Sequence, residues 1–340
     1  MYMVNIEAVG DNIFRIPVPV PFPMKYVYCY LFRETDGWSL VDAGFHYPDA
    51  VDAWEEVFRK LGVNRQHIHS IYVTHFHPDH FGLAGWMQQQ TGAKVWMSRE
   101  DYAMAERVWK KRSDQANQVG VVFRQHGVPD ELAKQIEESM QKLSKHVMPL
   151  PSLTILENDE VILGQRRWKV IAVPGHSDGL INFYQPELKC LLVSDHVLER
   201  ITPNISVWPG SHPNPLQQYF SSLHKVRHLD VAIALPAHGT VIGHLRERID
   251  EIIKHHEKRL DYMKSLASDG KTAYEVAYAV FVHKPLTPHQ WRFAIAETLA
   301  HLDYLASLDE LVKEEREGVI VYHFRREDSH LKERKGVGGR

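Results

Sequence analysis

Residues 71–82 read IYVTHFHPDHFG and join a short apolar strand to a turn with four potential metal ligands. Residues 70–74 are mostly apolar or β-branched, which is typical of a buried strand. Residues 79–90 are expected to form a helix, because Pro78 and Asp79 are suited to a first helical turn. The potential ligands between strand and helix are His75, His77, Asp79 and His80.

The spacing of these residues indicates two ion-binding positions. In an extended segment, side chains two residues apart point the same way, so His75 and His77 can bind one ion. Asp79 and His80 lie past the bend and can bind a second ion. Imidazole and carboxylate groups suit zinc, with iron or manganese as alternatives. A solvated His-rich loop is the competing interpretation in a chain with 22 histidines, but the HxHxDH spacing directly after a strand favours a metal site.

The HxHxDH pattern resembles the metallo-β-lactamase superfamily of binuclear metal hydrolases. The resemblance covers roughly residues 10–245 and predicts further ligands downstream, each following an apolar run. The segments that match are VPGHSDG (173–179) with His176, LLVSDH (191–196) with Asp195, and ALPAHG (234–239) with His238. LVDAG (40–44) is similar to the segment that carries the structural Asp of the family, here Asp42, and residues 201–205 resemble a loop beside the site.

The resemblance implies an α/β fold of four layers, αββα, and a pair of divalent cations, most typically zinc. It implies one cation held by His75, His77 and His176, and a second held by Asp79, His80 and His238. Asp195 is expected to bridge them, and Asp79 is expected to be catalytic by orienting a water and moving its proton. A flavodiiron-type oxidoreductase is disfavoured, because that relative has a carboxylate where this chain has His77.

Residues 1–244 are predicted to form the catalytic domain. Its first part is predicted to contain a hairpin of residues 26–32 and 38–41, a helix over 48–61, and a strand interrupted by the prolines of residues 17–23. Residues 99–147 are predicted to be a helical cap over the site, with helices over 100–118 and 129–146. Trp109, Phe123 and Met140 either contact substrate there or pack the helices together.

Residues 245–324 are predicted to form a winged-helix-like domain. A long charged helix over 245–266 is followed by a capping box at Thr272 and Glu275 and a third helix after Thr287. The His255–His256 pair of the long helix is expected to face solvent. The arrangement resembles the C-terminal module of a superfamily branch that includes endoribonucleases. Residues 325–340 are charged and end in glycine, which predicts a disordered tail.

Composition and charge limit which binding partners and which cellular location the protein is expected to have. The net charge of -3 over 340 residues offers no global electrostatic reason to bind nucleic acid or an anionic membrane. No apolar run approaches the roughly 20 residues of a membrane-spanning helix. Cys29 and Cys190 are expected to be reduced core thiols. With no signal peptide at the N-terminus, these features predict a cytoplasmic protein.

These observations favour a metal-dependent hydrolase that cleaves an ester, thioester or lactone bond of a small metabolite. The alternative is an RNA endonuclease, which needs a basic track along its surface. The short basic clusters at residues 110–112 and 325–326 both have acidic neighbours. A non-catalytic winged helix that binds DNA is disfavoured by the full set of ligands. For the winged helix we favour dimerisation, which predicts a homodimer.

Overall fold

The computed structural model describes residues 4–110, 113–283 and 285–325. The N-terminal part builds a sheet whose strands follow in chain order from β1 to β7. Strands β1 to β4 are antiparallel, and the pairs from β4 to β7 are parallel. The strands are β1 (Glu7–Gly10), β2 (Ile13–Pro19), β3 (Tyr26–Glu34), β4 (Gly37–Val41), β5 (Ile68–Tyr72), β6 (Lys94–Met97) and β7 (Leu153–Ile155).

A second sheet has the order β12-β11-β10-β9-β8. Its pairs are antiparallel except β11 with β12, which run parallel. The strands are β8 (Glu160–Leu163), β9 (Arg166–Ala172), β10 (Ile181–Gln185), β11 (Cys190–Ser194) and β12 (Ile233–Pro236). Every residue of β10 and β11 is buried, because this part of the sheet is covered on both faces.

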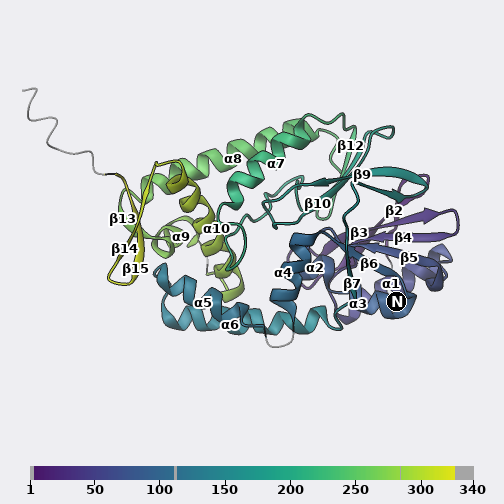
Figure 1. Cartoon of the computed structure of the whole chain (residues 1–340), viewed down its shortest axis with the longest axis horizontal. Helices are drawn as coiled ribbons and strands as arrows, with labels where there is room; N and C mark the ends of the chain where they lie inside the picture. The colour runs from purple at the N-terminus through teal and green to yellow at the C-terminus, as the bar shows by residue number, and fades with distance from the viewer. Residues whose placement is uncertain (1–3, 111–112, 284, 326–340) are drawn as a thin grey trace, which may run out of the picture.

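The two sheets pack face to face between outer layers of helices, which confirms the predicted αββα fold (Figure 1). Phe32, Trp168 and Phe183 fill the space between the sheets. Helices α1 and α3 cover the outer face of the first sheet, and α7 and α8 cover that of the second. The helices of these layers are α1 (Pro48–Leu61), α2 (Pro78–Phe81), α3 (Ala84–Thr91), α7 (Pro215–Arg227) and α8 (Leu245–Leu266), with a short 3-10 turn at Arg65–His67.

Several predicted elements are confirmed, and one interruption is not. Helix α1 has the predicted bounds, and β3 with β4 forms the predicted hairpin. The predicted break at Pro17 is wrong, because β2 continues through Pro17 to Pro19. Among the described residues, none pairs with β2 beyond Arg15 on the side of β1, so prolines that lack an N–H donor are tolerated in this stretch.

Residues 99–147 form three helices rather than the two expected. The predicted helix over 100–118 is wrong, because the chain ends α4 (Arg99–Trp109) and starts again at α5 (Gln115–Gln125). Just before the restart, the Oγ of Ser113 accepts a hydrogen bond from the backbone N–H of Gln115 at 3.2 Å, a local turn contact that favours a break there. The remaining helices are α6 (Asp130–Leu143), close to its predicted bounds, and the 3-10 turn Ser144–Val147.

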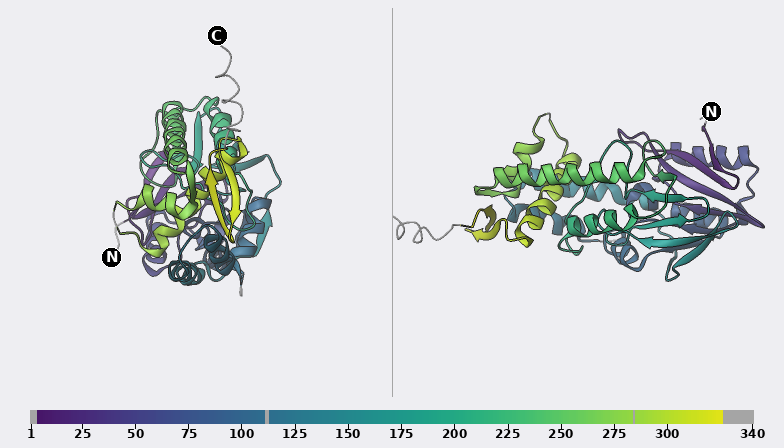
Figure 2. Two further views of the ribbon diagram at one scale, coloured as in Figure 1. Left: turned by 90° about the vertical axis from the view of Figure 1, so that its left-hand side faces the viewer. Right: turned by 90° about the horizontal axis from the view of Figure 1, so that it is seen from above.

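The C-terminal part follows α8 with a small sheet of order β13-β15-β14 and two more helices. Its elements are β13 (Asp269–Thr272), α9 (Ala273–Phe281), α10 (Pro288–Ser307), β14 (Val312–Arg316) and β15 (Val319–His323). The predicted capping box at Thr272 is confirmed, and Thr287 forms another with Gln290. In Figures 1 and 2, α8 extends from the second sheet to this part, and α10 lies between α8 and the α5–α6 pair. The predicted tail falls almost entirely outside the described residues.

The expectation that both His255 and His256 face solvent is wrong for His256. Its ring is fully buried and stacks on His301 of α10, with ring centroids 5.2 Å apart. Helix α8 is charged on one face only, and the other face packs on α7 and α10. Cys29 and Cys190 are buried free thiols, as expected. Among the described residues, none of the helices combines the length and apolar character needed to cross a membrane.

Candidate metal centre and active site

The segment after β5 carries two of the histidines into the interior. Strand β5 ends at Tyr72, and the chain then runs through His75 and His77 before α2 starts at Pro78. Proline suits the first position of a helix, because the N–H that it lacks would have no partner there. His75 is fully buried, and His77 is partly exposed. The short helix α2 then places Asp79 and His80 beyond the bend.

The other predicted residues reach the same region from the ends of strands. His176 follows β9, Asp195 follows β11 directly, and His238 follows β12. Gly175 has a φ of +141°, and a Cβ there would lie 2.5 Å from the Cβ of Tyr219. The backbone that presents His176 therefore requires glycine before it.

The structure brings all seven predicted residues together. His75, His77 and His176 form one group of potential ligands, and Asp79, His80, Asp195 and His238 form another, with ligand atoms within 4.8 Å of one another in each group. Asp195 lies between the groups, since its Oδ2 is 3.5 Å from His176 Nε2 and 3.5 Å from His80 Nε2. Its Oδ1 is 3.6 Å from His238 Nε2.

Hydrogen bonds on the outer side of the cluster orient four of the imidazoles. In each ring Nδ1 contacts an oxygen outside the cluster, which leaves Nε2 to face the centre. The partners are Thr74 Oγ1 for His75 (3.0 Å), Asp42 Oδ2 for His80 (2.8 Å), the Asn204 carbonyl for His176 (2.9 Å) and the Tyr26 carbonyl for His238 (2.8 Å). His77 is the exception, because it turns Nδ1 toward His176 Nε2 at 3.0 Å.

Several side-chain atoms that face the centre of the cluster lack hydrogen-bond partners. Whether these atoms suit a metal ion depends on their chemical type. Nε2 of His75, His80 and His238 and Oδ1 of Asp195 are buried without a partner among the described residues. Leaving several polar atoms unpaired in one place is unfavourable unless something else binds them. The atoms are imidazole nitrogens and carboxylate oxygens, which is the donor set of zinc and of neighbouring transition metals. The residues therefore fit a pair of divalent cations.

The protonation states of four of the candidate ligands suit the same purpose. Burial lowers the pKa of His75 and of His77 well below the usual value, so both rings are neutral and can donate a lone pair. Burial opposes ionisation of Asp79, but His80 and His238 outweigh it and lower the pKa of Asp79 to about 2. The pKa of Asp195 is lowered as well, against burial, by His238 and His80. Both carboxylates are thus ionised at neutral pH. Against burial, Asp42 and Asp195 raise the pKa of His80, and Asp195 and Asp79 raise that of His238, so these two rings would release a proton when a cation binds.

Asp42 orients residues of the centre through hydrogen bonds, which agrees with the structural role that the sequence suggests for it. Its carboxylate accepts hydrogen bonds from the backbone and the hydroxyl of Thr74, at 2.8 Å and 2.9 Å, besides the one from His80. Thr74 also contacts Ser194, the neighbour of Asp195, at 2.8 Å. One buried carboxylate therefore connects segments from both sheets.

Asp101 of α4 is a second support, and the sequence analysis missed it. Its carboxylate accepts hydrogen bonds from the backbone N–H of Phe76 (2.9 Å), the Ser177 hydroxyl (2.8 Å) and the backbone N–H of Gly179 (2.7 Å). It thereby joins the turn that holds His75 and His77 to the loop that holds His176. An aspartate in an acidic first helical turn carries no local signal for this function.

A cavity of about 560 Å³ opens beside the cluster, and His77, Asp79 and Asp195 form part of its wall. Trp109 and Met140, two of the predicted cap residues, line it, whereas Phe123 does not and packs in the helical core. Residues 22–24 line it from the β2–β3 loop. The wall is predominantly apolar, which is typical of a site for a small organic molecule.

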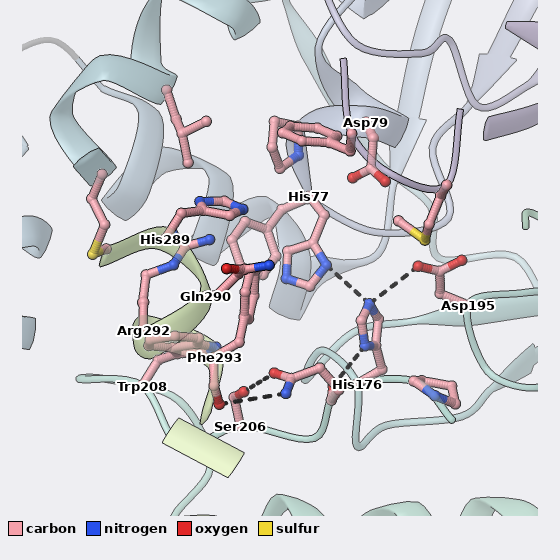
Figure 3. Close-up of a pocket in the computed structure, with 18 of the residues that line it drawn as sticks. His77, Asp79, His176, Asp195, Ser206, Trp208, His289, Gln290, Arg292 and Phe293 are labelled. Carbon is pink, nitrogen blue, oxygen red and sulfur yellow. Dashed lines mark hydrogen bonds and ion pairs between the residues drawn. The ribbon is translucent and has the colours of Figure 1, made fainter. Parts of the chain in front are cut away.

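The side of the cavity away from the carboxylates belongs to α10, which the sequence analysis did not connect with the site (Figure 3). His289, Gln290, Arg292 and Phe293 of this helix line the cavity. The ring of His289 stacks on Phe22 with centroids 5.8 Å apart, so α10 contacts the β2–β3 loop. Asn204, from the loop predicted to lie beside the site, donates a hydrogen bond to Glu297 of α10 at 2.8 Å.

Comparisons with known proteins agree with this architecture. The family model described as the metallo-beta-lactamase superfamily matches residues 23–238, and that of the metallo-beta-lactamase-like C-terminal domain matches residues 260–326. The chain is 27% identical over 297 residues to the probable metallo-hydrolase YqjP of Bacillus subtilis, covering 84% of this chain and 90% of that protein.

Two solved structures are similar over almost the whole chain. A metallo-beta-lactamase family protein of Thermus thermophilus has 31% sequence identity and a TM-score of 0.84, with 94% of this chain and 100% of that chain covered. A beta-lactamase domain protein of Burkholderia ambifaria has 29% identity and a TM-score of 0.83, with 94% of each chain covered. By these matches the chain belongs to the metallo-beta-lactamase superfamily, and it is a metallo-hydrolase of that superfamily.

Proposed function

We propose that this protein hydrolyses an ester, thioester or lactone bond of a small metabolite with the help of two divalent cations, most suitably zinc. One cation would be held by His75, His77 and His176, and the other by Asp79, His80 and His238, with Asp195 shared between them. The observation that carries the proposal is the set of unpaired nitrogen and oxygen atoms that face one another beside an apolar cavity.

Cations bound there would supply Lewis acidity, which lowers the pKa of a water and polarises the oxygen of the bond to be cleaved. The carboxylate of Asp79 is the group placed to handle the proton of that water. It is ionised, it lines the cavity, and its Oδ2 contacts His238 Nε2 at 3.2 Å. Asp79 can therefore orient an attacking water, accept its proton as it attacks, and return that proton to the departing group.

The cavity supports a small substrate. Its volume of about 560 Å³ suits a metabolite rather than a polymer, and its wall is mostly apolar. Among the described residues of the wall, Arg292 is the one permanent cation. No observation on the described residues therefore favours the RNA endonuclease alternative, which requires a series of cations along a groove.

The C-terminal part is proposed to be a winged helix that forms a homodimer. Support comes from its order of elements, with one strand after α8, two helices, and then two strands that pair as a hairpin. The division of the chain at residue 244 and the role of residues 99–147 as a cap belong to the same proposal. The cap is supported by Trp109 and Met140 on the cavity wall.

Metal analysis joined to an activity panel tests the proposal. The purified protein is expected to contain about two zinc equivalents per chain, as in binuclear hydrolases. It is expected to cleave at least one member of a panel of esters, thioesters and lactones, to lose that activity on chelation, and to regain it with zinc. His77→Ala should abolish turnover. Full activity in a metal-free sample would contradict the proposal, and cleavage of labelled single-stranded RNA that His77→Ala abolishes would favour the alternative.

A further inference from the structure

Arg292 is the feature of the cavity that hydrolysis of a neutral substrate leaves unexplained. Its guanidinium makes no hydrogen bond or ion pair with any described residue, and its Nε is buried without a partner. Burial lowers the pKa of Arg292 to about 10, so the group remains charged at neutral pH. The side chain as a whole is partly exposed at the cavity wall, so this charge is open to a ligand there, and no described carboxylate pairs with it.

The surroundings hold the Arg292 side chain in place without using its N–H donors. Its guanidinium carbon lies 4.3 Å from the ring centroid of Phe293 and 5.6 Å from that of Trp208. Cation–π contacts of this kind fix the group while leaving its donors free. In Figure 3, Arg292 lies near His289 and Gln290, across the cavity from Asp79 and Asp195.

The acidic group nearest in sequence on the same helix is already engaged. Glu297 binds Arg259 of α8 through Oε1 and accepts the hydrogen bond of Asn204 through Oε2. The carboxylates of Asp79 and Asp195 belong to the candidate metal centre. None of these carboxylates therefore pairs with Arg292, and a negatively charged molecule in the cavity can supply the partner.

We propose that Arg292 is an anion-binding subsite that selects substrates with a carboxylate at the end remote from the bond to be cleaved. This inference rests on the proposed function, and it deepens that function by naming a substrate class. The substrate would have an apolar body against the cavity wall, the scissile bond beside Asp79, and the carboxylate on the guanidinium. A carboxylate is favoured over a phosphate dianion, because one guanidinium balances one negative charge and its planar fork matches two carboxylate oxygens.

Ligand binding to the zinc-loaded full chain tests the subsite without requiring turnover. Octanoate and octanamide are titrated calorimetrically into the natural protein, Arg292→Met and Arg292→Lys. Octanoate should bind the natural protein about 10-fold or more tightly than octanamide, as expected for a charge-assisted hydrogen bond. Arg292→Met should remove this preference, and Arg292→Lys should retain part of it. If octanoate binds Arg292→Met as tightly as it binds the natural protein, its carboxylate binds elsewhere and the proposal is wrong.

Measuring the rate of substrate cleavage tests the subsite a second time, independently of the binding titration. The compared substrates are matched thioesters that end in a carboxylate, a phosphate or a methyl ester. The carboxylate should have the highest kcat/KM, and Arg292→Met should lower the ratio of its kcat/KM to that of the methyl ester to about one. A preference for the phosphate would overturn the choice of anion. If none of the three is cleaved, the proposed hydrolysis is at fault, and the binding titration still decides the subsite.

Two controls separate binding from folding. Arg246→Met removes a solvent-exposed arginine of α8 and should leave every ratio unchanged. Thermal unfolding of Arg292→Met should occur at about the same temperature as in the natural protein, because no described residue bonds to the guanidinium and methionine keeps an apolar side chain there. Unfolding at a clearly lower temperature would assign Arg292 a structural role and contradict the proposal.

Discussion

At the scale of single residues, the centre depends on which ring nitrogen each imidazole turns inward. Asp42 Oδ2 contacts His80 Nδ1 at 2.8 Å, and the Asn204 carbonyl contacts His176 Nδ1 at 2.9 Å. A ring whose Nδ1–H is held in this way keeps the lone pair of Nε2 for a cation. Asp42 is therefore expected to affect metal affinity although it does not belong to either group of potential ligands.

Asp42→Asn is expected to weaken zinc binding by about 10- to 100-fold, as loss of an outer partner of a ligand typically does. The asparagine side chain has one acceptor oxygen, and its amide group would face donors from Thr74 and His80. Competition with a fluorescent zinc chelator measures the effect. Asp52→Asn, at an exposed position of α1, is the matched control. Equal zinc affinity in both variants would show that Asp42 does not support the centre.

At the scale of elements, local signals and packing account for different parts of the fold. Helix α1 could be predicted because its apolar residues recur at helical spacing, and α9 because Thr272 and Glu275 form a capping box. The continuation of β2 through Pro17 could not be predicted from sequence, because it depends on the residue at which β1 stops pairing with β2. The burial of His256 likewise depends on α10 lying against α8.

The contact between α8 and α10 predicts acid sensitivity. His301 Nδ1 donates to the Glu297 carbonyl at 2.7 Å, so its Nε2 can accept from His256 Nδ1 at 3.0 Å. His256 Nε2 is therefore buried without a hydrogen-bond partner among the described residues. Burial, and to a lesser extent His301, lowers the pKa of His256 to about 2 in the folded protein. The unfolded chain takes up the proton near pH 6.5, so stability is full above that pH and falls on acidification.

At about pH 5 the neutral His256 should cost the folded protein about 2 kcal/mol relative to neutral pH. His256→Phe should remove this part of the loss, so its free energy of unfolding should change less between about pH 7.5 and 5. Urea unfolding of the zinc-loaded proteins measures this difference. His224→Phe, at an exposed site on α7, controls for the substitution. An identical loss in all three proteins would mean that His256 is not held neutral.

At the scale of the whole molecule, the site is shared between segments far apart in the chain. The seven candidate ligands could be predicted from sequence, because each lies in a short motif at the end of a strand or just after one. The place of Arg292 in the cavity wall could not be predicted from sequence, because it results from the packing of α10 against the loop that contains Trp208. Between Trp291 and Phe293 its sequence context indicates only helix packing.

We propose that seven side chains from both halves of the chain hold two cations. A crystal structure of the protein grown with zinc, with anomalous data collected at the zinc edge, tests it most directly. We expect two peaks roughly 3.5–4 Å apart, as in other binuclear sites. One peak should contact His75, His77 and His176, the other Asp79, His80 and His238, and Asp195 should lie between them. A cluster without zinc, or zinc bound elsewhere while these side chains point apart, would contradict the account.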